Sequence, residues 1–157
     1  MVTRRTLTVE LLGVPAGAGV ERRRAERWLR ALIAELAPEA DSFCARFVDD
    51  AEMRELNRRW RGKDRATDVL SFPGEATPEG RHLGDVVISL DAARRQAAAG
   101  GRELAEEVQT LLLHGALHCL GLDHETDDGE MEEAEARLRR RWTAGDGAFS
   151  TTGGGAR

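Results

Sequence analysis

The chain has 157 residues, of which 41% are hydrophobic and 32% charged, as in a soluble globular domain and unlike a disordered or fibrous protein. With 23 basic and 28 acidic residues the net charge is −5, so any binding to nucleic acid requires a local basic patch. No apolar run approaches the roughly 18 residues that span a bilayer, and we expect no membrane partner.

The first half of the sequence alternates between strand-like and helix-like hydrophobic patterns. Leu7, Val9 and Leu11 alternate with polar residues, which favours a strand. The competing interpretation, a signal peptide, is disfavoured because Glu10 interrupts the apolar stretch. Asp50 is a candidate N-cap for a short helix. We predict four elements in this half: strands at 6–12 and 42–48, and helices at 20–36 and 51–60.

The second half is predicted to be mostly helical. A β-rich run at 67–72 and a loop at 75–82 precede a buried strand at 83–90. Asp91 is expected to cap the first of three helices, at 91–99, 103–120 and 129–142. Residues 143–157 are rich in Gly, Ser and Thr and are expected to be disordered. The order of elements predicts a single α+β domain over residues 1–142, a small mixed sheet packed with helices.

Three of the four histidines lie close together near the end of the helix predicted at 103–120. His114 and His118 are four residues apart, which places both imidazoles on one helix face, one turn apart. Gly121 allows the helix to end and the chain to turn back, so that His124 can supply a third nitrogen. Three neutral imidazoles satisfy the ligand number of a catalytic zinc site and leave the fourth position to water. We therefore predict one Zn²⁺ ion on these histidines.

The three histidines have two other possible interpretations. A single histidine on an apolar helix is usually a core residue, but three at this spacing are difficult to explain that way, because buried imidazoles need polar partners. A structural zinc site with four protein ligands would need another donor. Cys119 directly follows His118 and therefore points about 100° around the helix. Cys44 lies on a distant predicted strand. With only two cysteines there is no disulfide framework, and we expect reduced thiols in a cytoplasmic protein.

The spacing H-x-x-x-H-x-x-G-x-x-H is also the zinc-binding pattern of the metzincin peptidases, so we expect a metzincin-like zinc-site helix. In those enzymes a glutamate directly follows the first histidine and acts as the general base. Here that position is Gly115. The absence of this glutamate argues against a metallopeptidase.

A basic segment lies between Arg54 and Arg65. It carries a net charge of +4, from six basic residues and the two acidic residues Glu55 and Asp64. Most such segments are solvated helix faces. Beside a metal site, however, guanidinium groups suit phosphate, because arginine bonds phosphate oxygens bidentately. The basic residues are Arg54, Arg58, Arg59, Arg61, Lys63 and Arg65.

Four segments, NRRWRGKD at 57–64, TDVLSFP at 67–73, LGDVVIS at 83–89 and HGALHCLGLDH at 114–124, resemble the motifs of the YbeY family in order and spacing. The resemblance covers about residues 40–142. It departs at Trp60, where the family usually has tyrosine, and around Gly121, where a leucine and a tyrosine are more usual than Cys119 and Leu122. These apolar exchanges leave the histidines intact.

The resemblance implies a metal-dependent endoribonuclease specific for single-stranded RNA, acting in 3′-end maturation of the small-subunit (16S) ribosomal RNA and in ribosome quality control. The implied partners are ribosomal RNA and the small ribosomal subunit, and not DNA. The resemblance also implies zinc on His114, His118 and His124, and a functional arginine at Arg61.

The basic residues can be given roles within this interpretation. We expect Arg61 to stabilise charge on the phosphoryl oxygens, and Lys63 and Arg65 to hold the RNA backbone without reading bases. Asp68 and Asp85 are candidate general bases, although capping or support of the site is the more common role for such residues. The alternatives are a metallopeptidase and a non-catalytic, zinc-containing ribosome-assembly factor.

Overall fold

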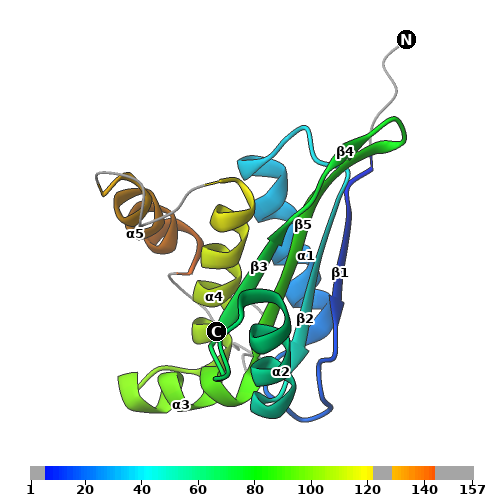
Figure 1. The fold of residues 1–157 in the computed structure, drawn as a ribbon. Helices are drawn as coiled ribbons and strands as arrows, with labels where there is room; N and C mark the ends of the chain where they lie inside the picture. The colour runs from blue at the N-terminus through cyan, green and yellow to red at the C-terminus, as the bar shows by residue number, and fades with distance from the viewer. Residues whose placement is uncertain (1–5, 122–128, 144–157) are drawn as a thin grey trace.

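The computed structural model describes residues 6–121 and 129–143, and its centre is a five-stranded mixed sheet (Figure 1). The strand order is β1-β2-β5-β3, with β1 (Thr8–Leu12), β2 (Ser42–Val48) and β5 (Gly80–Ser89) parallel to one another. β3 (Val69–Pro73) runs antiparallel to β5 at the end of this order, and the short β4 (Ala76–Thr77) pairs with the start of β5. The single α+β domain predicted from the sequence is confirmed.

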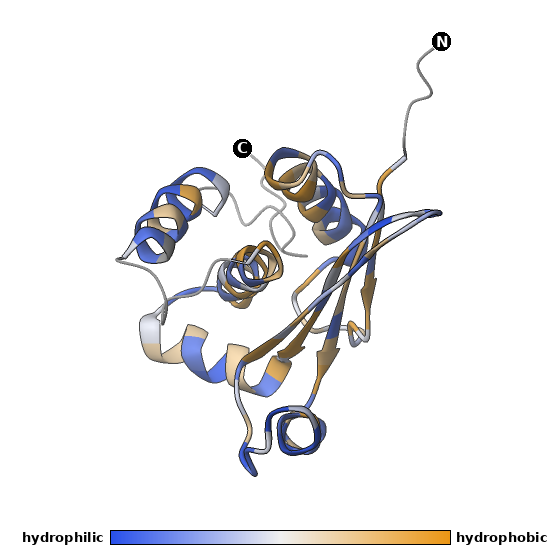
Figure 2. Ribbon diagram, turned by 45° about the horizontal axis from the view of Figure 1, so that its top comes forward, coloured by the Kyte–Doolittle hydropathy of each residue, from blue (hydrophilic) through white to orange (hydrophobic). Residues whose placement is uncertain are grey.

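In the described part of the chain, five helices cover the two faces of the sheet unequally. α1 (Arg22–Leu36) and α4 (Leu104–Cys119) lie on one face and α2 (Asp50–Arg61) on the other, while α3 (Leu90–Gly100) and α5 (Glu130–Trp142) lie beside α4 (Figure 2). Within the described ranges, no helix is both long and apolar enough to cross a membrane.

Two separate hydrophobic clusters correspond to these two faces. Val86 and Ile88 of β5 belong to the large cluster with α1 and α4, whereas Val87 belongs to the small cluster with Met53 of α2 and Leu70 of β3. Alternate strand residues point to opposite faces, so β5 supplies side chains to both clusters. This double burial explains why 86–88 reads as a continuous apolar run.

Two helix caps differ from the predicted ones. Asp49, not Asp50, caps α2, since its Oδ1 accepts a hydrogen bond of 2.8 Å from the Glu52 amide. Ser89, not Asp91, caps α3 through a 3.1 Å bond from the Ala92 amide to its Oγ. The two expected caps instead bind between elements: Asp50 Oδ1 accepts from Ser89 Oγ, and Asp91 Oδ2 accepts from the Asp50 amide. The starts of α2 and α3 are thereby tied together.

The loop expected at 75–82 is wrong, because this segment is a β-hairpin formed by β4 and the first residues of β5. Thr77 Oγ1 donates a 3.1 Å hydrogen bond to the Gly80 carbonyl across the turn. The hairpin is held by main-chain hydrogen bonds, and the residues of β4 are exposed. Because these residues bury no side chain in the core, their sequence lacks the hydrophobic alternation of a buried strand. Most other boundaries lie within about two residues of the predictions.

The C-terminal helix α5 is fastened to α1 by a pair of tryptophans. Trp28 Nε1 donates a 2.9 Å hydrogen bond to the Trp142 carbonyl, and the two indoles meet edge to face with centroids 6.2 Å apart. Trp142 Nε1 in turn donates to Glu35 Oε2 over 3.3 Å. Residue 142 therefore ends α5 at a defined place on the fold. The tail predicted to be disordered lies almost wholly outside the described residues.

Helix α4 lies so close to the sheet that only glycine fits at two of the contacts. A Cβ added to Gly115 would lie 2.6 and 2.8 Å from the two methyl groups of Val86. On the sheet side, a Cβ added to Gly84 would lie 2.5 Å from Cys119 Sγ. These distances are shorter than any normal carbon contact, so neither position has room for a side chain.

We predict that Gly115→Ala destabilises the fold, because the new methyl group meets branched side-chain atoms on a rigid strand. Overpacking of this kind costs about 1–3 kcal/mol, which opposes the ~1 kcal/mol that alanine gains over glycine within a helix. We expect a net fall in Tm of a few degrees, measured by circular dichroism.

Gly100→Ala is the matched control, since Gly100 also lies in a helix but a Cβ there meets only the flexible Arg102 side chain, at 3.1 Å. It should leave Tm unchanged or raise it. A Gly115→Ala variant as stable as the Gly100→Ala variant would show that α4 is free to move away from the sheet.

Candidate functional site

The two helical histidines meet at their outer nitrogens. Nε2 of His114 and Nε2 of His118 lie 3.0 Å apart, and the ring centroids lie 4.5 Å apart. Their spacing on α4 brings both rings to one face, as the sequence indicates. His124, the third predicted ligand, lies outside the described residues.

A carboxylate that sequence reasoning missed holds the first histidine. Glu135 of α5 is hydrogen-bonded through its carboxylate to Nδ1 of His114 and is only 8% exposed. Arg139 lies 3.5 Å from the other oxygen of the same carboxylate. A signal existed in the sequence: Glu135 shares a helix face with Leu138 and Trp142, which pack against the core. An acidic residue on such a face needs a buried partner.

The histidine pair fits a metal ion as far as the described residues extend. Glu135 engages Nδ1 of His114, which leaves Nε2 for a metal, the arrangement usual for metal-binding histidines. Two nitrogens on one tetrahedral zinc ion are about 3.3 Å apart, close to the 3.0 Å found here. Within residues 6–121 and 129–143 no three His, Cys, Asp or Glu side chains form a metal-binding group. His124, the third predicted donor, lies outside these ranges and stays a prediction.

A cavity of about 340 Å³ opens beside the histidine pair, and α2, β3 and α4 all contribute to it. Arg61 comes from the last turn of α2. Asp68 is the residue directly before β3, and Ser71 lies in the middle of that strand. A guanidinium group and two imidazoles thus face one space, although 53 residues separate Arg61 from His114 in the sequence. The lining residues are Arg61, Thr67, Asp68, Val69, Ser71, His114 and His118.

Local backbone structure explains how Arg61 reaches this cavity. Gly62 adopts the left-handed conformation, with φ 70° and ψ 17°, and so ends α2 directly after Arg61. Asn57 is 3% exposed, and its Nδ2 donates a 2.9 Å hydrogen bond to the Arg65 carbonyl. This bond folds residues 62–65 back against the helix. Lys63 and Arg65, the other predicted RNA contacts, are exposed and do not line the cavity.

Ion pairs divide the basic segment into neutralised and available cations. Arg54 pairs with Asp64 over 2.8 Å, and Arg58 pairs with Glu55 over 2.6 Å. Hydrogen bonds from these arginines lower the pKa of Asp64 and of Glu55, so both carboxyl groups stay ionised. In the described part of the chain the other four cations of the segment make no ion pair: Arg59, Arg61, Lys63 and Arg65.

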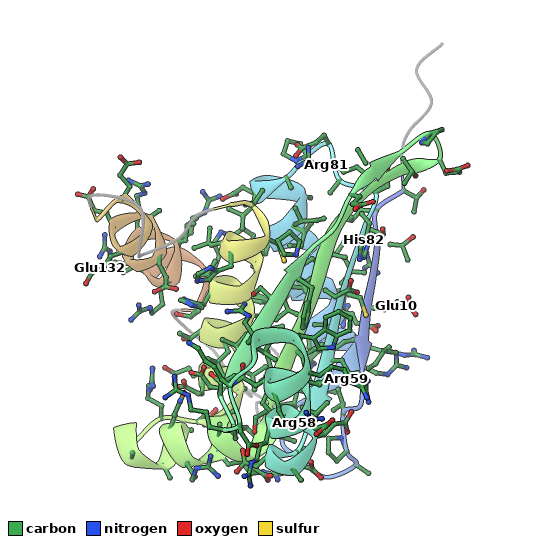
Figure 3. The ribbon with its side chains drawn as sticks, in the orientation of Figure 1. Glu10, Arg58, Arg59, Arg81, His82 and Glu132 are labelled. Atoms are coloured by element: carbon green, nitrogen blue, oxygen red, sulfur yellow. The ribbon has the colours of Figure 1, made fainter. Side chains whose placement is uncertain are left out.

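The two candidate general bases lie in different places. Asp68 lines the cavity, and its Oδ2 accepts a 3.1 Å hydrogen bond from Gln96 Nε2. Asp85 lies on β5 and does not line the cavity; its carboxylate is 3.1 Å from Nε2 of His82, which Figure 3 labels, and His82 Nδ1 lies 2.7 Å from Ser42 Oγ. Of the two aspartates, only Asp68 is placed to act on a group bound near Arg61.

The cysteines take no part in the cavity. Cys119 Sγ packs toward Gly84 on the sheet, in agreement with its expected direction away from the histidines. Burial raises the pKa of the Cys119 thiol to about 12 and also raises the pKa of Cys44. Both thiols are therefore protonated at neutral pH.

Position 115 explains why the peptidase glutamate has no counterpart here. Gly115 faces Val86 and not the cavity, and Ser71 Oγ donates a 3.1 Å hydrogen bond to its carbonyl. A glutamate side chain at this position would meet the sheet within its first bond. The contact between α4 and β5 therefore leaves no room for it.

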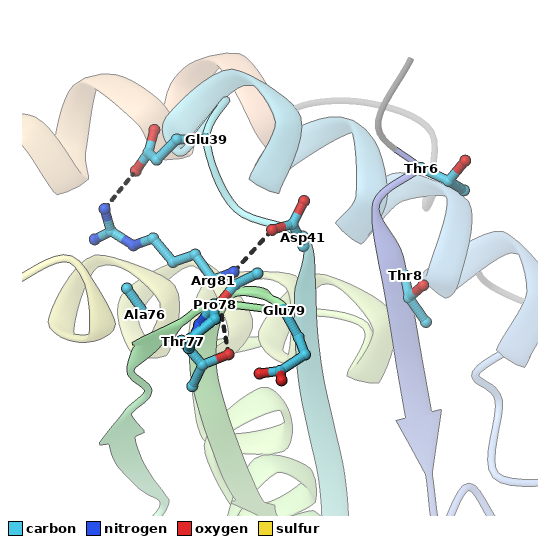
Figure 4. A pocket seen from close by; sticks show the side chains of 10 residues that line it. Thr6, Thr8, Glu39, Asp41, Ala76, Thr77, Pro78, Glu79 and Arg81 are labelled. Carbon is cyan, nitrogen blue, oxygen red and sulfur yellow. Dashed lines mark hydrogen bonds and ion pairs between the residues drawn. The ribbon is translucent and has the colours of Figure 1, made fainter. Parts of the chain in front are cut away.

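A larger cavity, of about 630 Å³, lies near the tip of the β4–β5 hairpin (Figure 4). Arg81 engages two of the three acidic residues that line it: its side chain pairs with Glu39 over 3.3 Å, and its main-chain amide donates a 2.7 Å hydrogen bond to Asp41 Oδ2 (Figure 4). It contains no histidine and none of the predicted site residues. The smaller cavity at His114 is thus the candidate site.

The chain is similar to known proteins over most of its length. The family model described as "Endoribonuclease YbeY" matches residues 18–143. A curated protein named endoribonuclease YbeY from Nautilia profundicola is 52% identical over 94 residues, which are 60% of this chain and 67% of that protein. One of the same name from Solibacter usitatus is 46% identical over 139 residues, 83% of this chain and 88% of the relative.

A solved structure has a similar fold. The solution structure of a Thermotoga maritima protein matches with a TM-score of 0.59 and 25% identity, over 92% of this chain and 97% of that one. A family model that covers four-fifths of the chain and a relative aligned over most of both lengths lead to one conclusion: this chain belongs to the endoribonuclease YbeY family.

Proposed function

We propose that the chain is a zinc-dependent endoribonuclease that cuts single-stranded RNA, with the 3′ end of the small-subunit ribosomal RNA as its substrate and a role in ribosome quality control. The observation that carries this proposal is the single cavity in which Arg61 faces the pair His114 and His118. The names of the relatives supply the reaction class, cleavage within an RNA chain.

Different residues around the cavity would bind the metal ion and the phosphate group. His114 and His118, with His124, would hold the zinc ion, and Glu135 keeps the His114 ring oriented. When bound, zinc supplies Lewis acidity toward a water molecule or a phosphate oxygen. Arg61 binds the phosphoryl oxygens through two parallel N–H donors and stabilises the charge that develops on them. Asp68 lines the same cavity, and we propose its carboxylate as the candidate proton acceptor.

Lys63 and Arg65 act outside the cavity. Both are exposed and make no ion pair in the described part of the chain, so their charges are available to flanking phosphates. Phosphate contacts position RNA without selecting its sequence. The neutralised Arg54 and Arg58 contribute less to this attraction.

The two alternative functions are less well supported. A metallopeptidase would need a general base directly after His114, and that position packs against the sheet. A non-catalytic assembly factor with a structural zinc ion would need four protein ligands and no cavity beside them. Here an arginine and an aspartate line a cavity of about 340 Å³ next to the histidines.

The proposed zinc site predicts the metal content of the protein. The purified chain should bind about one zinc ion, and His118→Ala should weaken that binding strongly because it removes one of three nitrogens. Elemental analysis and competition with a chromophoric chelator measure both quantities. His82→Ala is the control, since that imidazole pairs with Asp85 and Ser42 away from the cavity. Metal well below one equivalent after zinc reconstitution would refute the zinc site.

Glu135→Gln should lower zinc affinity by about 10- to 100-fold, because a neutral amide holds the His114 ring less firmly and lowers its basicity. Glu133→Gln, an exposed position on the same helix, is the matched control and should bind zinc as the wild type does. Chelator competition distinguishes the two variants without reference to activity. Equal affinities would mean that Glu135 only anchors α5.

Arg61→Ala should reduce the rate of RNA cleavage by about 10²- to 10³-fold at equal zinc content, the usual loss for one electrostatic contact in a transition state. Because Arg61 is exposed, Tm should stay within about a degree of wild type. Arg61→Lys should restore only part of the rate, since an ammonium group cannot make the bidentate contact.

Arg58→Ala serves as the control for Arg61→Ala: it removes a guanidinium from the same helix, but one that Glu55 already neutralises. Cleavage should then be close to wild type. Full activity in Arg61→Ala, or an equal loss in Arg58→Ala, would remove Arg61 from the site.

A further inference from the structure

An aromatic side chain lies exposed beside the candidate site without an explanation in the fold. Trp60 is 63% exposed, the larger fraction of the two large hydrophobic residues that are exposed within the described ranges. Its ring meets Phe72 edge to face, with centroids 6.0 Å apart and an interplanar angle of 74°. Phe72 itself packs against the small cluster under α2. A ring anchored in the core thus fixes the orientation of an indole that remains mostly in solvent.

The chain places this aromatic pair directly next to the cavity. Trp60 precedes Arg61 on α2, and Phe72 follows Ser71 on β3, while both Arg61 and Ser71 line the cavity. Successive strand residues point to opposite faces, so Ser71 faces α4 and Phe72 faces α2. β3 is also the last strand in the sheet order. The aromatic pair and the cavity therefore lie on the two sides of one outer strand.

The charges around Trp60 favour a polyanion. Arg59 and Arg61 flank it in the sequence, and neither makes an ion pair in the described part of the chain. Figure 3 shows Arg58 and Arg59 on α2, of which Arg58 is the one paired with Glu55. An exposed indole between two available guanidinium groups is the combination that binds single-stranded nucleic acids, in which bases stack on aromatic rings and cations contact the backbone.

We propose that Trp60, supported by Phe72, is a stacking subsite for one unpaired nucleobase of the RNA whose phosphate lies in the cavity at Arg61. This inference rests on the proposed endoribonuclease function and extends it. The face of a base is accessible only when the base is free of a helix, so the subsite selects single strands over duplexes. Since every base has such a face, it confers little sequence preference.

The test is a double-mutant cycle between protein and ligand. The ligands are two fluorescently labelled 2′-O-methyl hexanucleotides with equal numbers of phosphates, one carrying bases and one abasic throughout. Wild-type protein loaded with zinc should bind the base-bearing strand more tightly by about 5- to 150-fold, the range for stacking of one base. In Trp60→Ala this ratio should fall toward one, and in Trp60→Phe it should remain partly. Fluorescence anisotropy measures all the affinities.

Two controls separate stacking from general effects. Leu12→Ala removes the other exposed large hydrophobic residue, 46% exposed at the opposite end of the strand order, and should keep the full ratio. The dependence of affinity on salt should be the same in Trp60→Ala as in wild type, because the phosphate contacts are unchanged. Because Trp60 is largely exposed, Tm should also be unchanged.

The outcomes distinguish this inference from the function on which it rests. If wild type discriminates between the two ligands and Trp60→Ala does so equally well, the base is bound elsewhere and the inference is wrong. If wild type binds both ligands with equal affinity, no base is stacked at all and the inference is again wrong. If wild type binds neither ligand and cuts no single-stranded RNA, the proposed function itself fails.

Discussion

The close contact between α4 and β5 determines where every other part of the site can be. Gly115 of α4 lies against Val86, and Gly84 of β5 lies against Cys119 of α4. These two close contacts fix the distance of α4 from the sheet and its rotation about its own axis. The rotation that places Gly115 on the sheet also turns His114 and His118 toward the first residues of β3. Arg61, from α2 on the other face of the sheet, lines the same cavity. The arrangement of the side chains around the cavity therefore depends on glycine at positions 84 and 115.

Ion pairing determines which cations near the cavity can attract RNA. In a protein with a net charge of −5, attraction of RNA depends on which cations remain available and not on their number. Two local acids neutralise Arg54 and Arg58, and the cations left over are those nearest the end of α2. Because the loop after α2 is fixed by the buried Asn57, these charges are held close to the cavity.

The local part of this structure could be predicted from the sequence, and the nonlocal part could not. Four-residue spacing is a property of any helix, so the proximity of His114 and His118 follows from the sequence alone. The partnership of Glu135 with His114 depends on how α5 docks, which no local pattern encodes. The exchanged caps have a third cause: Asp49, Asp50, Ser89 and Asp91 are all competent caps, and contacts between elements decide which of them is used.

The tryptophan pair at the end of α5 gives the site a dependence on a distant part of the chain. Trp142 is held by Trp28 and Glu35 of α1, and seven residues earlier the same helix supplies Glu135 to His114. The orientation of the His114 ring therefore depends on the contacts of Trp28 and Glu35 of α1 with the end of α5. A proteolytic nick between residues 135 and 142 would leave His114 and His118 on α4 and still separate Glu135 from the anchor at Trp142. The position of the His114 ring therefore depends on an unbroken backbone through α5 as well as on the spacing of residues along α4.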